Sequence, residues 1–343
     1  MIEAATHAGQ RRRSAAVERL YRLYDAAGVL PLLLCVLILV FALFVPHFAS
    51  VENILNVLRS SSFLMIVSCG QMLVLIVGGF DLSVGSVVAL ASVISAIVMA
   101  GLKVPLAGDP ALITLLGVLG GLGCGMAVGL LNGLCVAWLK ISPFMVTLGT
   151  MSIAGGVAFV LTDGIPVYGM PVTYVNGFGR GLWLDLPAAV YLAIAVVAAI
   201  WVVQNLTRMG RYIFAIGGNL DAAVVSGVRT RVYLTASYTL SALLAALTGL
   251  ALTAEIGSGQ ASMGAQLTLE SIAAAVIAGV SLRGGVGRVE MVALGSIFLL
   301  ILTNAMDLLN VDSRLQTIFL GVILVLAVAA EEARGRKWGR GQR

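Results

Sequence analysis

Acidic side chains are few in the apolar part of this chain. Asp81 lies inside a long apolar run, and Glu255, Glu270 and Asp307 lie within or beside other runs. A carrier driven by protons or ions usually needs ionisable groups at mid-membrane depth, and Asp81 is the one certain candidate. The energy for any transport by this chain is therefore expected to come from another protein.

Motifs that would give the chain its own catalytic chemistry are missing. There is no Gly-Lys dipeptide, which a phosphate-binding Walker loop requires, and no His-Glu-x-x-His or Gly-x-Ser-x-Gly segment. The four cysteines lie in apolar runs without metal-ligand spacing. We expect no cofactor and no metal on this chain. An intramembrane enzyme, which needs paired catalytic groups facing one cavity, is a weaker hypothesis than a transport protein.

The composition identifies the class of protein that holds these residues. The chain is 60% hydrophobic and 11% charged, whereas soluble domains carry about 25% charged residues. Its net charge of +5 comes from arginines gathered in the N-terminal segment, one central loop and the C-terminal segment. That distribution is typical of the cytoplasmic parts of a membrane protein, not of a nucleic-acid-binding protein. We expect an all-α polytopic protein in contact with membrane lipid.

Ten transmembrane helices are expected, some of them short, broken or re-entrant. They lie in a membrane region, residues 28–332, between basic tails at 1–27 and 333–343. An even number of spans puts both tails on one side, and the arginine-rich segments 207–231 and 283–288 fall on that side too, which predicts cytoplasmic termini. The expected spans are residues 28–46, 61–78, 83–100, 111–137, 144–162, 187–205, 233–254, 268–282, 289–306 and 315–330, with Phe48 to Ser60 as a connector.

One apolar run, Phe63 to Ala100, is too long for a single span. As a straight helix it would measure about 57 Å, against ~30 Å of hydrocarbon in a bilayer. Gly78 and Gly79 allow the chain to turn, and Asp81 or Ser83 can cap the next helix. Two interpretations remain open: Asp81 is only a helix cap, or the broken helix lines a permeation route.

A second segment resembles this break. Residues 79–85 (Gly-Phe-Asp-Leu-Ser-Val-Gly) and 279–285 (Gly-Val-Ser-Leu-Arg-Gly-Gly) both separate two apolar runs. Transporters are often built from duplicated halves whose broken helices meet near the middle of the membrane. The similarity favours such a repeat weakly, because the chain is rich in these residue types.

Polar side chains inside otherwise apolar spans are candidates for a translocation path. Such side chains also bind helices to one another, so each has two interpretations. The candidates are Gln71, Asp81, Ser83, Asn132 and Asn304.

A glycine stripe marks the fourth span. Gly117, Gly121, Gly125, Gly129 and Gly133 recur at every fourth residue. A helix face without side chains lets a neighbouring helix approach closely. We expect this stripe to serve packing.

Aromatic residues mark the longest polar loop, residues 163–185. Tyr168, Tyr174 and Trp183 suit the membrane–water interface. A docking surface for a partner is the alternative.

The basic loop 206–231 contains the pattern of a very short helix. Asn219 can cap it, Asp221 and Ala222 fall in its first turn, and Gly227 can close it. A helix this small cannot bury enough surface to be stable alone. It needs the ends of the spans, or a partner, to hold it.

Three segments of the chain resemble a known family. Asp221-Ala222-Ala223-x-x-x-Gly227 resembles the Glu-Ala-Ala-x-x-x-Gly pattern with which ABC importer permeases dock their ATPase subunits. Residues 78–86 and 279–288 resemble stretches of ribose-type (monosaccharide) permeases in the branched-chain amino acid/ribose superfamily. The resemblance covers residues 28–332. It departs from the family at Asp221, where glutamate is usual, and at Arg283, where a small residue is common.

The resemblance implies a permease subunit that imports a ribose-like monosaccharide or related polyol across a bacterial inner membrane. Its implied partners are ABC ATPase subunits that bind ATP and Mg²⁺, a periplasmic or lipid-anchored sugar-binding protein, and a second copy or a homologous permease. The alternative is an autonomous secondary carrier or channel for a small polar solute. The residues implied in ATPase coupling are Gly210, Arg211, Gly218, Asn219, Asp221, Ala222, Ala223 and Gly227, with Arg283, Gly284, Gly285 and Arg288 in a second cytoplasmic turn.

Overall fold

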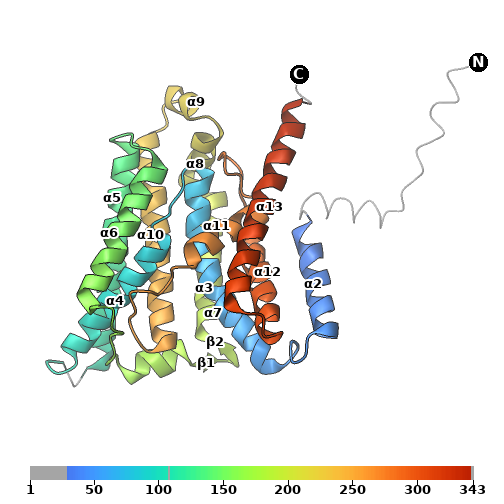
Figure 1. The fold of residues 1–343 in the computed structure, drawn as a ribbon. Helices are drawn as coiled ribbons and strands as arrows, with labels where there is room; N and C mark the ends of the chain where they lie inside the picture. The colour runs from blue at the N-terminus through green and yellow to red at the C-terminus, as the bar shows by residue number, and fades with distance from the viewer. Residues whose placement is uncertain (1–28, 107–108, 341–343) are drawn as a thin grey trace, which may run out of the picture.

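The described part of the chain, residues 29–106 and 109–340 of a computed structural model, is a bundle of helices (Figure 1). Seven helices are long and apolar enough to cross a membrane and three shorter ones are apolar, so the ten expected spans each correspond to a helix. The seven are α3 (Val51–Ile76), α4 (Val84–Leu102), α5 (Pro110–Ala137), α6 (Pro143–Thr162), α7 (Ala188–Leu206), α10 (Thr230–Ile256) and α12 (Val289–Leu308). The three are α2 (Leu30–Phe44), α11 (Leu267–Ile277) and the first part of α13 (Ser313–Arg340).

The two ends of the bundle carry different structures. Helices α8 (Arg208–Gly218) and α9 (Leu220–Val225) project at one end, where α13 also ends (Figure 1). The opposite end carries the π-helix η1 (Thr173–Gly179) and a small hairpin of β1 (Leu182–Trp183) and β2 (Leu186–Pro187). We refer to these as the α8–α9 end and the η1 end.

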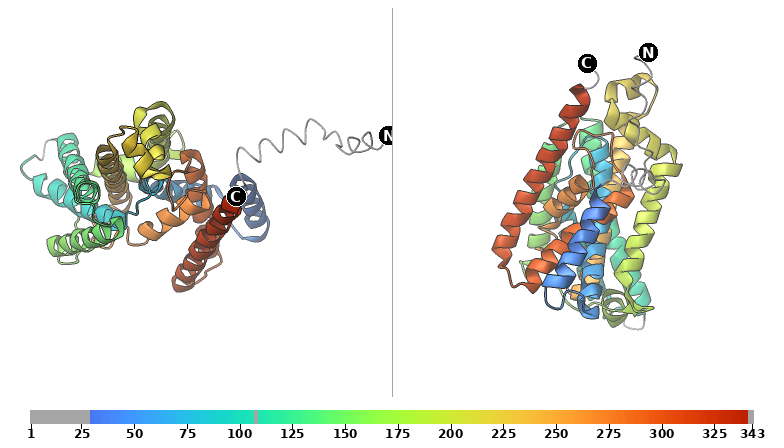
Figure 2. Two further views of the ribbon diagram at one scale, coloured as in Figure 1. Left: turned by 90° about the horizontal axis from the view of Figure 1, so that it is seen from above. Right: turned by 90° about the vertical axis from the view of Figure 1, so that its right-hand side faces the viewer.

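Helix α10 forms the centre of the bundle and packs against α3, α4 and α5. Helices α2 and α13 stand on the side opposite α5 and α6 (Figure 2). Most of α3 is buried, whereas α5, α6 and α7 leave most of their apolar side chains exposed. In a membrane such exposure needs no cover, because lipid tails are as apolar as leucine.

The glycine stripe of α5 packs as expected, and all five of its glycines are buried. A Cβ atom added at Gly125 would lie 2.5 Å from the Ala246 Cβ atom, and one at Gly129 would lie 2.7 Å from the Ala242 Cβ atom. The α5 backbone therefore lies directly on α10, at a separation that only glycine permits.

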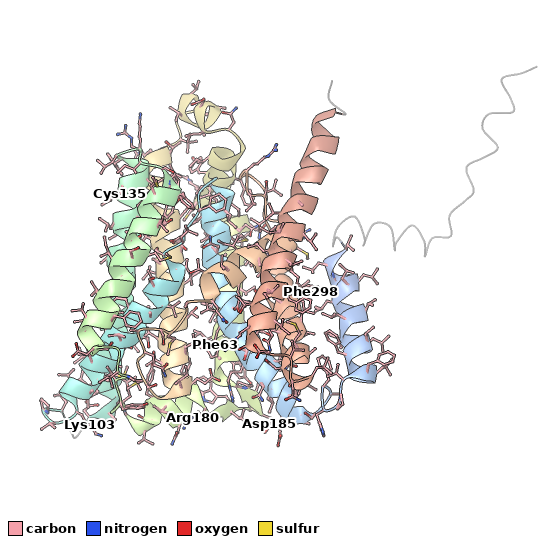
Figure 3. The ribbon with its side chains drawn as sticks, viewed as in Figure 1. Phe63, Lys103, Cys135, Arg180, Asp185 and Phe298 are labelled. Carbon is pink, nitrogen blue, oxygen red and sulfur yellow. The ribbon has the colours of Figure 1, made fainter. Side chains whose placement is uncertain are left out.

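Two helices begin inside the bundle. Residues 77–83 descend from the α8–α9 end before α4 starts (Figure 1), and α4 then continues to the η1 end, where Lys103 follows it (Figure 3). This break is therefore a non-helical segment inside the bundle and not a surface turn. Residues 257–266 likewise lead to α11, whose 11 residues span about 16 Å, too short to cross a bilayer. The starts of the two helices meet, because the Gly85 amide donates to the Thr268 hydroxyl at 3.0 Å.

The expected repeat is only partly right. The two broken segments that meet at helix starts are 77–83 and 257–266, not 79–85 and 279–285. Residues 279–288 instead connect α11 to α12 at the α8–α9 end, where they contact the C-terminal end of α3: the Gly285 amide donates to the Ile76 carbonyl at 2.8 Å. Local similarity between Gly/Leu/Ser-rich segments did not reveal that residues 257–266 are the segment that leads into α11.

Several expected boundaries differ in the structure. The expected connector Phe48 to Ser60 is mostly helix, because Ser50 caps α3 by accepting from the Asn53 amide at 3.3 Å. The expected basic tail from residue 333 continues α13 to Arg340. The N-terminal tail, residues 1–27, lies outside the described residues.

The aromatic loop 163–185 is more ordered than its sequence suggested. Tyr174 is buried, and its hydroxyl donates to the Leu250 carbonyl at 2.6 Å. The expectation that Tyr174 faces the interface is therefore wrong, whereas Tyr168 and Trp183 are exposed.

Candidate functional site

Three glycine pairs from distant parts of the chain meet at the α8–α9 end. They are Gly78–Gly79 after α3, Gly217–Gly218 at the end of α8, and Gly284–Gly285 in the turn before α12. The Ile76 carbonyl, which accepts from Gly285, lies directly beside Gly217. We call this contact of α8, α3 and the 281–288 turn the glycine junction.

Glycine is required at the junction by contact and by backbone conformation. A Cβ atom at Gly217 would overlap the Ile76 carbonyl oxygen and the Gly285 amide nitrogen. Gly284 and Gly285 have φ angles of 89° and 73°, a region that side chains disfavour. The end of α8 therefore touches backbone directly, with no side chain between the elements.

Gln204 at the end of α7 fixes the same turn. Its amide nitrogen donates to the Gly287 carbonyl at 3.0 Å, and its amide oxygen accepts from the Val289 amide at 3.1 Å. Beside it, the Arg288 guanidinium pairs with the Glu290 carboxylate at 2.8 Å. Sequence reasoning missed Gln204, although a buried amide at the end of an apolar span was an available signal.

Helix α8 lies against the bundle with one apolar face. Ile213 and Ile216 are buried, and Gly210 lies against the Gln204 carbonyl, where a side chain would not fit. Arg211 is exposed. The loop 206–231 therefore contains an additional helix that its sequence did not clearly predict.

Helix α9 confirms the pattern expected of residues 219–227. The Asn219 side-chain oxygen accepts from the Ala222 amide at 2.9 Å. Gly227 closes the segment with a φ of 77°. Ala223 faces inward and is buried in the main apolar core. The outward face consists of Leu220, Asp221, Ala222, Val224 and Val225, all exposed.

Three of the five candidate path residues form one buried hydrogen-bonded cluster. The Ser83 hydroxyl and amide donate to one oxygen of Asp81, at 2.6 and 3.0 Å, and the Ser241 hydroxyl donates to the other at 3.1 Å. The Asn132 amide donates to the Ser83 hydroxyl at 2.9 Å. This Asp81 cluster binds the break at residues 77–83 to α5 and α10. Ser241 was not predicted.

The expected helix cap is wrong, because the Ser83 side chain makes no capping hydrogen bond to α4 and Asp81 accepts from the Ser83 amide instead. Two roles of the Asp81 cluster, holding the break in place and taking part in permeation, can be distinguished by mutation. Asp81→Asn keeps an acceptor for Ser83, whereas Asp81→Ala leaves the buried Ser83 amide unpaired, at about 1–3 kcal/mol for each such group. We expect Asp81→Ala to lower the thermal unfolding temperature strongly and Asp81→Asn to stay near wild type, measured in detergent. Equal stability of both variants would contradict a scaffolding role, and a stable Asp81→Asn variant without transport would show that the charge itself is used.

Gln71 and Asn304 do not join the Asp81 cluster. Gln71 is fully buried on α3, and neither its amide nitrogen nor its amide oxygen has a partner among the described residues. Asn304 exchanges two hydrogen bonds with Asn53, at 2.8 and 2.9 Å, and so binds α12 to α3. Of the two interpretations given to the polar candidates, the binding of one helix to another therefore explains Asn304.

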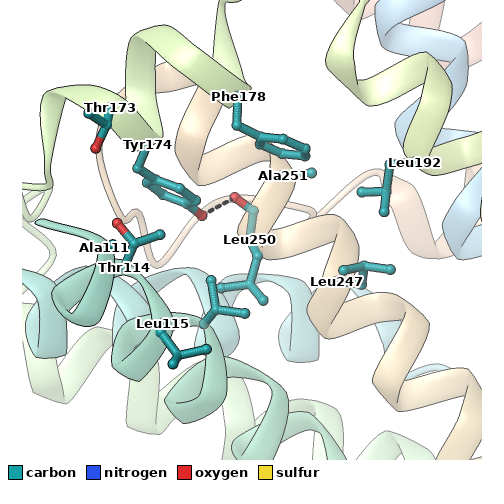
Figure 4. A pocket seen from close by; sticks show the side chains of 11 residues that line it. Ala111, Thr114, Leu115, Thr173, Tyr174, Phe178, Leu192, Leu247, Leu250 and Ala251 are labelled. Atoms are coloured by element: carbon teal, nitrogen blue, oxygen red, sulfur yellow. Dashed lines mark hydrogen bonds between the residues drawn. The ribbon is translucent and has the colours of Figure 1, made fainter.

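A cavity of about 540 Å³ lies between α5, α7, α10 and η1. Leu115, Leu192, Leu247 and Ala251 dominate its walls, and the Tyr174 hydroxyl is already bonded to Leu250 (Figure 4). A solute rich in hydroxyl groups would leave them unpaired here, at a cost of several kcal/mol. This cavity suits apolar groups.

These features define a class of protein: a polytopic helical membrane protein with two helices, α4 and α11, whose starts meet inside the bundle, and with the helices α8 and α9 projecting at one end. Within the described residues, no cluster of three or more His, Cys, Asp or Glu could hold a metal ion.

The chain belongs to the family described as "Branched-chain amino acid transport system / permease component", whose model matches residues 53–328. It is similar to the ribose import permease proteins of Haemophilus influenzae (34% identical, covering 89% of this chain and 92% of that protein) and Bacillus subtilis (34%, 88% and 91%). It is also similar to the L-arabinose transport system permease protein of Escherichia coli (37%, 90% and 90%). No solved structure matches the chain.

Proposed function

We propose that this chain is the permease subunit of an ABC importer for a ribose-like monosaccharide, powered by separate ATPase subunits. The observation that carries the proposal is the preformed α9 knob, whose core contact Ala223 and outward apolar face match a docking segment. The relatives named for ribose and L-arabinose import support the substrate class.

The α8–α9 end faces the cytoplasm in this proposal. Cationic residues gather there, as the positive-inside rule requires of cytoplasmic segments. The η1 end then receives sugar from a binding protein outside the cytoplasm. The cationic residues of the α8–α9 end are Lys140, Arg208, Arg211, Arg229, Arg231, Arg283 and Arg288.

Transport in this proposal depends on a rigid mechanical connection. The ATPase pair changes its separation when it binds ATP, and α9 moves with it. Helix α8 carries the motion to the glycine junction, where Gly217 touches the end of α3 and the 281–288 turn. Since that turn begins α12, one displacement reaches two spans and can switch the path between inward-open and outward-open states.

The outward face of α9 supplies the sharpest test of ATPase docking. Val225 is 89% exposed, so Val225→Arg leaves the packing of this chain unchanged. A buried charge in an interface costs at least about 2 kcal/mol, and we expect co-purification of the ATPase subunits to fall at least tenfold, as ~1.4 kcal/mol is one tenfold step. Uptake in proteoliposomes falls with it.

The matched control places the same substitution at the other end. Val104 is 86% exposed near the η1 end, and Val104→Arg should leave ATPase co-purification at the wild-type level. Retained co-purification with Val225→Arg would overturn docking through α9. Uptake by this chain alone, dependent on an ion gradient and indifferent to ATP, would instead support the alternative of an autonomous carrier or channel.

Substrate range is measured with the complete transporter. Radiolabelled D-ribose, D-allose and L-arabinose are offered with ATP inside the vesicles and the binding protein outside. ATP-dependent accumulation of at least one of these aldoses is the expected result.

A further inference from the structure

A second cavity, of about 490 Å³, lies between α3, α10, α11 and α12 and is closed on one side by residues 257–266. Its volume falls in the range of about 300–1,000 Å³ that is usual for small-molecule sites. Polar side chains from two parts of the chain that are distant in sequence line it, α3 and the continuous stretch from the end of α10 into α11. They are Ser60, Glu255, Gln260, Ser262, Gln266 and Glu270.

The two carboxylates of this cavity have free acceptor capacity. Glu270 lies in the first turn of α11 and is half-buried, without a hydrogen bond or ion pair among the described residues. The nearest cation to Glu255 is Arg59, with 3.9 Å between the guanidinium and carboxylate atoms, beyond hydrogen-bond length. A carboxylate that is partly removed from water is costly without partners, so Glu270 favours a ligand that donates hydrogen bonds. The charge of Glu255 already has Arg59 and Arg180 nearby, but its oxygens can still accept hydrogen bonds from a ligand.

The rest of the lining narrows the chemistry of that ligand. Phe63 and Met263 supply an apolar wall, while the amides of Gln260 and Gln266 can both donate and accept. An aldose matches this combination, because it has hydroxyl donors and acceptors around its ring and an apolar C–H face. A metal ion matches it less well, since only two carboxylates line the cavity and they come with aromatic and thioether groups.

The position of the cavity connects it to the Asp81 cluster. Gly264 lines the cavity and also lies against Gly85, at the point where α11 and α4 begin. Gly85 is two residues from Ser83, which belongs to the Asp81 cluster. An occupant of the cavity would therefore lie beside the starts of α4 and α11.

We propose that this cavity is an aldose-binding station inside the permease, in which Glu270 is the principal acceptor of hydrogen bonds from sugar hydroxyls, with Glu255 beside it and the wall formed by Phe63 opposite. The proposal rests on the sugar-import function proposed above and names a site for it. Sequence reasoning found no set of acids and aromatics for a sugar, because Phe63 and Glu270 are separated by most of the chain and only folding brings them together.

Transport by the complete importer gives the first test. Glu270→Gln keeps the shape of the side chain and removes its charge. Loss of a hydrogen bond to a charged group weakens binding by about tenfold or more, so we expect a tenfold or greater rise in the solute concentration for half-maximal uptake of D-ribose, D-allose or L-arabinose. The matched control Glu52→Gln, at an exposed position on the same helix as Phe63, should transport as wild type.

Chemical labelling gives a second test that does not depend on the folding of a carboxylate variant. Ser262→Cys, in a background with the four native cysteines replaced, places a thiol on the wall of the cavity while both carboxylates remain. Each aldose at millimolar concentration should slow labelling by a methanethiosulfonate reagent at least threefold, and should not do so when Glu270→Gln is added.

The outcomes separate this site from the proposed function. ATP-dependent uptake with unchanged half-saturation in Glu270→Gln, or labelling of Ser262→Cys that no aldose slows, overturns the binding station and leaves the importer intact. Failure of the chain to bind ATPase subunits overturns the importer, and labelling protected by an aldose would then still support the cavity.

Discussion

Gly217→Ala is expected to abolish coupled uptake while its neighbour Gly218→Ala does not. The new methyl group would overlap the Ile76 carbonyl and the Gly285 amide, and neither backbone atom can rotate away. Overpacking costs about 1–3 kcal/mol even where side chains can adjust. We therefore expect ATP-dependent uptake to fall at least about tenfold, since ~1.4 kcal/mol corresponds to one tenfold step.

The neighbouring glycine makes the comparison strict. Gly218, which the resemblance also implies in ATPase coupling, is in the same last turn of α8. Nothing lies within 4 Å of the position that its Cβ would take, so an added methyl group does not disturb the junction. Gly218→Ala should therefore be neutral, or stabilising by up to about 1 kcal/mol, as replacing a helical glycine with alanine usually is. Equal uptake by the two variants would show that the glycine junction does not carry coupling.

Gly129→Ala is expected to destabilise the bundle strongly. The new Cβ would lie 2.7 Å from the Ala242 Cβ and 2.8 Å from both the Thr239 Cα and the Tyr238 carbonyl oxygen. These close contacts can be relieved only if α5 and α10 move apart along their length, because backbone atoms form two of the three contacts. We expect a loss of about 1–3 kcal/mol, measured as a lower unfolding temperature in detergent.

Gly123→Ala is the control on the same helix. Gly123 is exposed on the opposite face of α5, with nothing within 4 Å of its added Cβ. Helix propensity alone then favours the alanine. Similar unfolding temperatures for Gly129→Ala and Gly123→Ala would contradict close packing of α5 on α10.

Local patterns predicted most of the fold. The apolar runs gave ten helices because length and hydrophobicity decide membrane spans, and the period of four in the glycines gave the packed face of α5. The cap at Asn219 and the closure at Gly227 were also predictable, since both depend on residues within one short segment.

Contacts between distant segments were not predictable in the same way. Nothing in the sequence places Gly217 against Ile76, or Asn304 opposite Asn53. Residues 268–282 were expected to form a full span, whereas α11 covers only Leu267–Ile277. An apolar run does not reveal that the residues before it, 257–266, enter the bundle without forming a helix. The cavity beside Glu270 needed four helices in place before its polar lining could be recognised.

The burial of Ala223 has a consequence for how fast and how tightly a partner can associate. Since the core of the bundle and the Asn219 cap already hold α9 in one conformation, its outward face is preorganised before any encounter. Association then avoids the loss of about 1–2 kcal/mol of backbone entropy for each residue that would otherwise have to be ordered. The free energy gained from contacts between the six-residue helix α9 and a partner can thus appear as affinity, because little of it is lost in ordering the helix.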